Sequence, residues 1–241
     1  MLLFQPDFSG INVAAALASI QAEGVTTLTA SSDDIKIGGG YSGGNAVNIT
    51  GTKYLKYPAN GKFTLGKGAI ELWFKPNWDT KAVKTGANTI FGANWNATQS
   101  VNFRFVLSSI VNLRFATGGI TLPSGGYPYS DEPMGIRSCK TTTWNLLQVF
   151  WNLETATNPF VLFRINDRYH QVFIFPINTI NALSGTPYFY IGSDLNGGNQ
   201  FDGQISDISI YDDPASLLPV AIDQMPTVGT LASFHPETTI C

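Results

Sequence analysis

The stretch 188–211 constrains the fold more than any other part of the sequence. It opens with aromatic and β-branched residues over 188–191, passes through a polar turn over 194–199 and becomes extended again over 201–211. Aromatic and β-branched residues suit a pleated, half-buried surface, whereas the Asn and Gly of the turn tolerate the positive φ that a reversal needs. The stretch therefore predicts two strands joined by a tight turn. Three apolar anchors mark the second strand: Ile205, Ile208 and Ile210.

The same stretch resembles the closing hairpin of laminin G-like domains in the concanavalin A-like lectin/glucanase superfamily. That hairpin has an Ile-Gly pair, a polar loop, then Phe-x-Gly-x-Ile-Asp-Asp and a hydrophobic residue before Ile-Tyr. The matching residues are Ile191, Gly192, Phe201, Gly203, Ile205, Asp207, Ile208, Ile210 and Tyr211, and Ser206 departs from the first Asp. Earlier family features follow in the same order: Gly43-Gly44, Val47, Tyr54, Pro58 and Leu72-Trp73-Phe74-Lys75-Pro76. The resemblance implies an all-β, two-sheet antiparallel jelly-roll sandwich.

Other segments add to this expectation. Apolar residues at helical spacing predict a short helix over 12–22, with Asn12 as its cap. Segments that alternate or are wholly apolar predict hairpins over 102–116 and 160–175 and a central strand over 144–151, whereas 118–137 is expected to be a loop. Trp73, Trp144 and Trp151 are expected in the core. We divide the chain into an N-terminal segment packing on the sandwich (1–40), the laminin G-like jelly roll (41–212) and a C-terminal tail (213–241).

Charge and hydropathy exclude several function classes. The net charge of −3 gives no reason to expect nucleic acid, because phosphate binding needs a basic footprint. No apolar run approaches the roughly 18 residues of a membrane-spanning helix, so we expect no membrane insertion. The first residues do not read as a signal peptide. The two cysteines, Cys139 and Cys241, are interpreted as reduced thiols.

The sequence predicts a protein that is not an enzyme. The resemblance implies that a glucanase of this superfamily would carry a Glu-x-Asp-x-x-Glu pattern on one strand. Hydrolysis with retention needs two carboxyl groups about 5–5.5 Å apart, and alternate residues on one strand face supply them. No such pattern occurs, and Glu71 stands alone.

Two segments are candidates for a glycan site, which needs an exposed aromatic ring and polar groups that hold hydroxyls. Asn94, Trp95 and Asn96 stand in one apparent loop. A second loop supplies Tyr127, Tyr129 and Asp131. The alternative interpretation is that these rings pack under their own loops or at a subunit contact.

Calcium is a possible cofactor. The resemblance implies that relatives bind it through Asp, Asn and backbone oxygens at the rim of the sandwich. Hard oxygen ligands lie close together here in Asp194, Asn196, Asn199 and Asp202. The alternative is a turn rich in Asn and Asp because those residues stabilise turns.

These inferences combine in one functional hypothesis. We expect a non-catalytic surface or structural protein with a lectin-like sandwich, on a virion (phage) surface or extracellular, as a surface or decoration protein. Its expected partners are glycans and other copies of itself or other virion proteins. Two alternatives stay open: a secreted or cell-surface carbohydrate-binding module, and a glycoside hydrolase.

Overall fold

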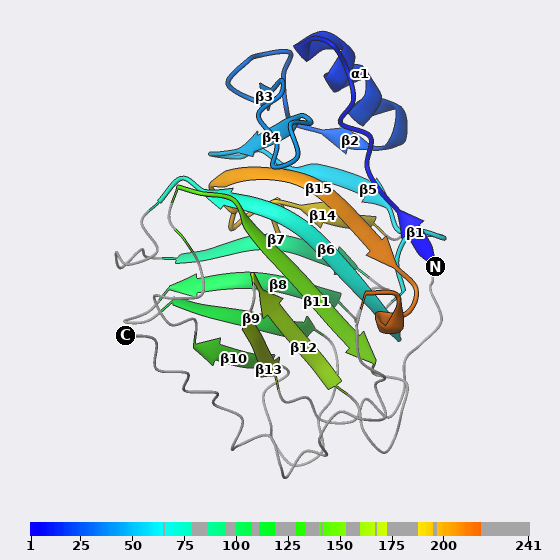
Figure 1. Cartoon of the computed structure of the whole chain (residues 1–241), viewed down its shortest axis with the longest axis vertical. Helices are drawn as coiled ribbons and strands as arrows, with labels where there is room; N and C mark the ends of the chain where they lie inside the picture. The colour runs from blue at the N-terminus through cyan, green and yellow to red at the C-terminus, as the bar shows by residue number, and fades with distance from the viewer. Residues whose placement is uncertain are drawn as a thin grey trace.

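The computed structural model describes residues 1–64, 66–78, 86–94, 100–107, 111–118, 129–133, 140, 142–152, 160–166, 168–172, 188–194 and 197–217. In this part of the chain, two antiparallel sheets face each other, and a short helix lies at one end of the sandwich (Figure 1). The predicted all-β sandwich of two antiparallel sheets with a short N-terminal helix is therefore confirmed.

The first sheet lies in front in Figure 1 and has the order β13-β12-β11-β6-β15-β4-β3, with β1 beside β15. Its central strands are β6 and β15, which are neighbours in the sheet although about 130 residues separate them in the sequence. The bounds are β1 Leu2–Phe4, β3 Ile35–Lys36, β4 Ala46–Ile49, β6 Lys67–Pro76, β11 Asn145–Asn152, β12 Phe160–Ile165, β13 Arg168–Val172 and β15 Gly203–Tyr211.

The second sheet lies behind the first and has the order β10-β9-β8-β7-β14-β5-β2. The predicted hairpins appear as β8–β9 in this sheet and β12–β13 in the other, and β11 lies between β6 and β12 as a central strand should. The bounds are β2 Val25–Thr26, β5 Leu55–Pro58, β7 Gly86–Asn94, β8 Ser100–Leu107, β9 Val111–Gly118, β10 Tyr129–Pro133 and β14 Tyr188–Ile191.

The helix α1 spans Val13–Glu23, and its first turn is capped as predicted. The Asn12 side chain accepts a hydrogen bond from the backbone N–H of Ala15 at 3.0 Å, which satisfies one of the donors that a helix start leaves without a partner. Ala16 and Ile20, one turn apart, are completely buried. The helix is thus held by one apolar stripe against the sandwich.

The strand β15 contains a β-bulge that its sequence requires. Ile205, Ile208 and Ile210 are all buried, although spacings of three and then two residues cannot place all three on one face of a regular strand. The register with β6 shifts between Ser206 and Ser209, and Asp207 has a φ of 49°. The extra residue therefore turns Ile208 back into the core and sends Asp207 toward the surface.

The two faces of β6 show where the core ends. Ile70, Leu72 and Phe74 are buried between the sheets. Glu71, Trp73 and Lys75, in contrast, are only half-buried on the face of the first sheet that points away from the second sheet. We call this side the outer face.

The N-terminal segment contributes to the core between the sheets. Its buried side chains in the main core cluster are Phe4, Phe8, Ala16 and Ile20. The division at residues 40 and 212 stays a prediction, and 218–241 lies outside the described residues.

Two sequence expectations are corrected. Trp151 is buried as expected, but Trp73 and Trp144 are only half-buried; Trp73 points away from the second sheet because its neighbours Leu72 and Phe74 point inward. The expected loop over 118–137 contains the edge strand β10, which pairs with β9 from Tyr129 to Pro133. A proline at the end of an edge strand removes no ladder bond that the sheet needs. Within the described residues, no helix has the length and apolarity to cross a membrane.

Candidate functional site

An aromatic pair stands on the outer face of the first sheet. The rings of Tyr41 and Trp73 are stacked, with centroids 3.3 Å apart and planes 9° from parallel. Trp73 comes from the middle of β6, and Tyr41 comes from the glycine-rich loop 38–44. Because Tyr41 covers Trp73 and is itself 52% exposed, the pair presents one flat ring to solvent. We call the pair the aromatic platform.

The loop that carries Tyr41 is shaped by its glycines. Gly38 and Gly43 have φ of +64° and +83°, a region that side-chain-bearing residues rarely adopt. The backbone N–H of Gly40 donates to the carbonyl of Gly44 at 2.8 Å, which closes the loop on itself. This loop places an aromatic ring on the outer face of the first sheet.

The bulge of β15 holds the loop in place. The backbone N–H of Tyr41 donates to the hydroxyl of Ser206 at 3.2 Å, and that hydroxyl donates to the carboxylate of Asp207 at 3.0 Å. The hydroxyl of Ser42 also donates to the Asp207 carboxylate, at 3.3–3.4 Å. Ser206, the residue that departs from the family pattern, is therefore the link between the loop and the strand. The platform has a carboxylate and a hydroxyl beside it.

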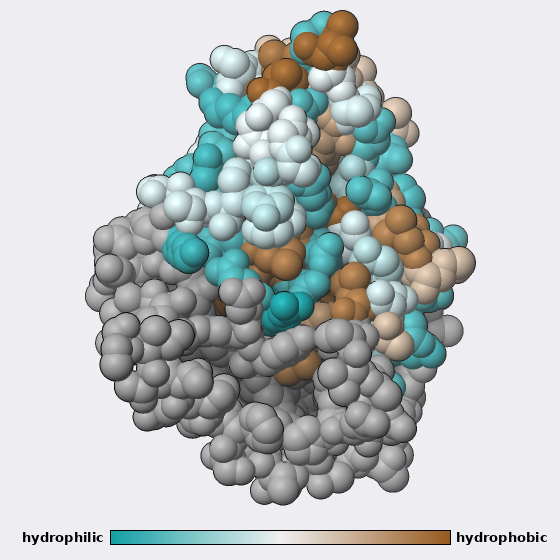
Figure 2. Space-filling view, viewed as in Figure 1, coloured by the Kyte–Doolittle hydropathy of each residue, from teal (hydrophilic) through white to brown (hydrophobic). Residues whose placement is uncertain are grey.

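A shallow depression of about 540 Å³ adjoins the platform. It lies between the start of α1, the segment after β3 and the outer face of β6 and β15, and it shares Gly39 with the loop. Its walls combine apolar, amide and cationic side chains. The lining residues are Val13, Ser32, Ile35, Lys36, Ile37, Gly39, Lys75 and Gln204. Figure 2 shows this side of the molecule, where small hydrophobic patches alternate with pale and hydrophilic residues over the described part.

A row of polar side chains crosses the same sheet further from the loop. The amide of Gln148 on β11 donates to the carboxylate of Glu71 and accepts from Arg164 of β12 at 3.1 Å. The register partners of Glu71 are Gln148 and Ser209. The side chain that contacts Glu71 is thus an amide. A glycosidase instead sets two carboxyl groups opposite each other as acid and nucleophile.

The structure places three of the six predicted glycan residues on the second sheet. Asn94 is the last residue of β7, where it pairs with Ser100, and Tyr129 and Asp131 lie in β10 rather than in a loop. Two strands separate β10 from β7, so these backbones are about 14 Å apart at a strand spacing of roughly 4.8 Å. Trp95, Asn96 and Tyr127 lie outside the described residues. The six residues stay a prediction.

The predicted calcium ligands are partly brought together. The carboxylate of Asp194 accepts from the backbone N–H of Gly198 at 2.8 Å and from the side-chain amide of Asn199 at 2.6 Å. Asp202 instead contacts the amide of Asn77, at 3.5 Å, and Asn196 is outside the described residues. The Asp194 carboxylate thus stabilises the turn that follows it. In the part of the chain that the structure describes, no group of three His, Cys, Asp or Glu side chains could hold a metal ion, and calcium stays a prediction.

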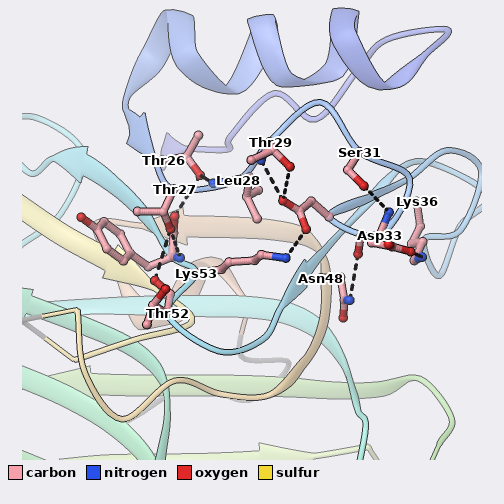
Figure 3. Close-up of polar contacts among 12 residues, drawn as sticks. Thr26, Thr27, Leu28, Thr29, Ser31, Asp33, Lys36, Asn48, Thr52 and Lys53 are labelled. Atoms are coloured by element: carbon pink, nitrogen blue, oxygen red, sulfur yellow. Dashed lines mark hydrogen bonds and ion pairs between the residues drawn. The ribbon is translucent and has the colours of Figure 1, made fainter.

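A second polar cluster surrounds a buried carboxylate (Figure 3). Asp34, 1% exposed, accepts from the backbone N–H and the hydroxyl of Thr29, each at 2.8 Å, and forms an ion pair with Lys53. Burial would raise the pKa of Asp34, but the hydrogen bonds from Lys53 and Thr29 outweigh burial and hold this pKa below its ordinary value. The cluster joins the segment before β3 to the segment after β4. Its role is structural.

Comparison with known proteins adds information on the fold alone. No protein-family model and no curated protein matches the chain. The binding domain of botulinum neurotoxin serotype D is similar in structure, with a TM-score of 0.51, 10% sequence identity and coverage of 79% of this chain and 43% of that one. A leech intramolecular trans-sialidase, complexed with 2,7-anhydro-Neu5Ac, has a TM-score of 0.50 and 16% identity, with coverage of 83% and 27%. The chain thus spans less than half the length of either.

Proposed function

We propose that this chain is a non-catalytic, glycan-binding surface protein with a laminin G-like, concanavalin A-like sandwich, and that it serves on a virion as a phage surface or decoration protein. The observation that carries glycan binding is the aromatic platform. A flat, exposed Tyr41 ring suits the C–H face of a sugar, and the neighbouring Asp207 carboxylate and Ser42 hydroxyl suit its hydroxyl groups.

The preformed geometry supports this proposal. Tyr41 is held by its stack on Trp73 and by the hydrogen bond from its backbone to Ser206, so little conformational entropy is lost when a sugar binds. Similarity in fold to a structure described as a binding domain is consistent with this role. The surroundings of Glu71, an amide and a serine in register, support a non-catalytic protein.

A glycan array tests the proposal. We expect the wild-type chain to bind one or more immobilised glycans and Tyr41→Ala to bind them more weakly, while Tyr188→Ala, a tyrosine variant on the second sheet, keeps wild-type binding. Absence of binding to every glycan on the array by a folded wild-type chain would reject the proposal. Binding that Tyr41→Ala leaves intact but Trp95→Ala removes would move the site to the predicted loop at 94–96.

The virion role rests on the low content of charged residues and on two exposed apolar side chains. Only 13% of the residues are charged, and Ile11 and Val25 at the helix end of the sandwich are 93% and 59% exposed, which suits docking to other copies or to other virion proteins. Mass measurement in solution over a concentration series tests this. We expect self-association that Ile11→Ser with Val25→Ser reduces. A monomer at all concentrations that still binds glycans would favour the alternative, a secreted or cell-surface carbohydrate-binding module.

A further inference from the structure

Two lysines flank the depression beside the aromatic platform. Lys36 is the last residue of β3, and Lys75 points outward from β6 two residues after Trp73. Residues two apart on a strand share a face and are separated by about 6.6 Å, so Lys75 and Trp73 are neighbours on the outer face. Gln204 of β15 is the register partner of Lys75 on β6, and its amide also lines the depression.

Neither ammonium group is closely paired with a carboxylate of the described residues. Lys36 forms a long ion pair with Asp33, 3.9 Å apart and beyond hydrogen-bonding distance, and the Asp33 side chain is 88% exposed (Figure 3). Lys75 lies over the ring of Trp144, with its nitrogen 5.4 Å from the ring centroid. Both cations are thus available to an anion in the depression.

The remaining residues around the depression indicate which chemical groups of a ligand would lie beside the anion. Val13 and Ile37 provide an apolar side, and Ile37 is 43% exposed. The Asp207 carboxylate is engaged by the hydroxyls of Ser42 and Ser206 and stands beside the platform rather than among the residues that line the depression. The site therefore has two parts. The part at Tyr41 suits a sugar ring and its hydroxyl groups, and the part between the two lysines suits an anion.

We propose that the ligand is an acidic saccharide, whose sugar ring lies on Tyr41 and whose anionic group lies between Lys36 and Lys75. This inference rests on the proposed glycan binding and adds the class of glycan. Ammonium groups form charge-assisted hydrogen bonds with carboxylates and with sulfates. The chemistry that these ligands share is a fixed negative charge on a sugar.

The test is an array with three matched arms: neutral oligosaccharides, oligosaccharides carrying a uronic or other carboxylated sugar, and sulfated oligosaccharides of the same backbones. The proteins are the wild type, the double variant Lys36→Gln/Lys75→Gln, and Lys56→Gln. Lys56 is a matched control because its ammonium also lies over an aromatic ring, that of Tyr188 on the second sheet. Thermal melting checks that every variant is folded.

We expect the wild type to bind glycans of a charged arm and not their neutral counterparts, and the choice between the carboxylated and sulfated arms identifies the anion. The double variant should lose about tenfold or more in affinity, and Lys56→Gln should lose none. Wild-type affinity should fall as salt is raised. Equal binding of neutral and charged arms, or full binding by the double variant, would overturn this inference and leave the proposed function intact. No binding in any arm would reject both.

Discussion

Two neighbouring segments of the N-terminal region use similar residues in opposite ways. In 26–34, Asp34 is buried and its carboxylate is fully engaged by Thr29 and Lys53. In 36–42, Lys36 and Tyr41 stand at the surface with partners that leave one side open to solvent. A polar cluster whose carboxylate is fully engaged thus stabilises the fold. A recognition site instead needs polar and aromatic groups that are held in place but keep one side free for a ligand.

The largest expected effect is on stability. Asp34→Ala should lower the free energy of unfolding by about 3–5 kcal/mol, because it leaves the partly buried Lys53 ammonium without its carboxylate. Asp33→Ala is the matched control, with an exposed side chain next in sequence, and should change stability by less than about 0.5 kcal/mol. Urea unfolding measures both. If the two variants proved equally stable, the cluster around Asp34 would not stabilise the fold.

The next effect is a dependence of stability on pH. Because the folded-state pKa of Asp34 lies below its unfolded value, its stabilising contribution is present above that unfolded pKa of about 3.9 and is lost as pH falls through the folded pKa. The stability difference between the wild type and Asp34→Asn should therefore be constant from neutral pH to about pH 5 and shrink in more acidic solution. Urea unfolding at several pH values measures it. A difference that grew on acidification would contradict the assigned role of Asp34.

Affinity provides the corresponding test of the open segment. Tyr41→Ala should weaken binding of any glycan found on the array by about tenfold, because the stacked ring is lost, while Tyr41→Phe should keep most of it. The melting temperature should change little, because Tyr41 is half-exposed. Calorimetric titration gives the affinities. A Tyr41→Ala variant that unfolds at much lower temperature would show that the platform is structural.

The smallest expected effect concerns calcium. Since the Asp194 carboxylate is engaged by Gly198 and Asn199, removing calcium with a chelator should shift the melting temperature by less than about 1 °C. Asp194→Ala, in contrast, should destabilise the turn by about 1–3 kcal/mol through the loss of two hydrogen bonds to a charged group. A clear loss of stability on chelation would instead support the predicted calcium site.

The fold was predictable because it rests on local patterns. Alternation located most strands, and Asn12 marked the helix start. The spacing of Ile205, Ile208 and Ile210 contained the bulge, although it was interpreted only as a row of anchors. The strand β10 was missed because glycine, proline and tyrosine around it are typical of loops and because its partner β9 decides its conformation.

The candidate site was not predictable in the same way. Tyr41 and Trp73 are 32 residues apart in sequence and meet only because the bulge at Asp207 accepts the glycine loop. Trp73 lay in a family-like strand motif, so it was assigned to the core. An outward position was nevertheless implied by its apolar neighbours on both sides, Leu72 and Phe74, which is the signal that could have identified it.

NMR mapping of a bound glycan onto the backbone, with a glycan chosen from the array, tests directly whether the aromatic platform is the binding site. We predict chemical-shift changes in Gly39 to Ser42, at the indole N–H of Trp73 and at Ser206 and Asp207, and little change around Asp34 and Lys53. Chemical-shift changes confined to 94–96 and 127–131, with none at the platform, would contradict glycan binding at the platform.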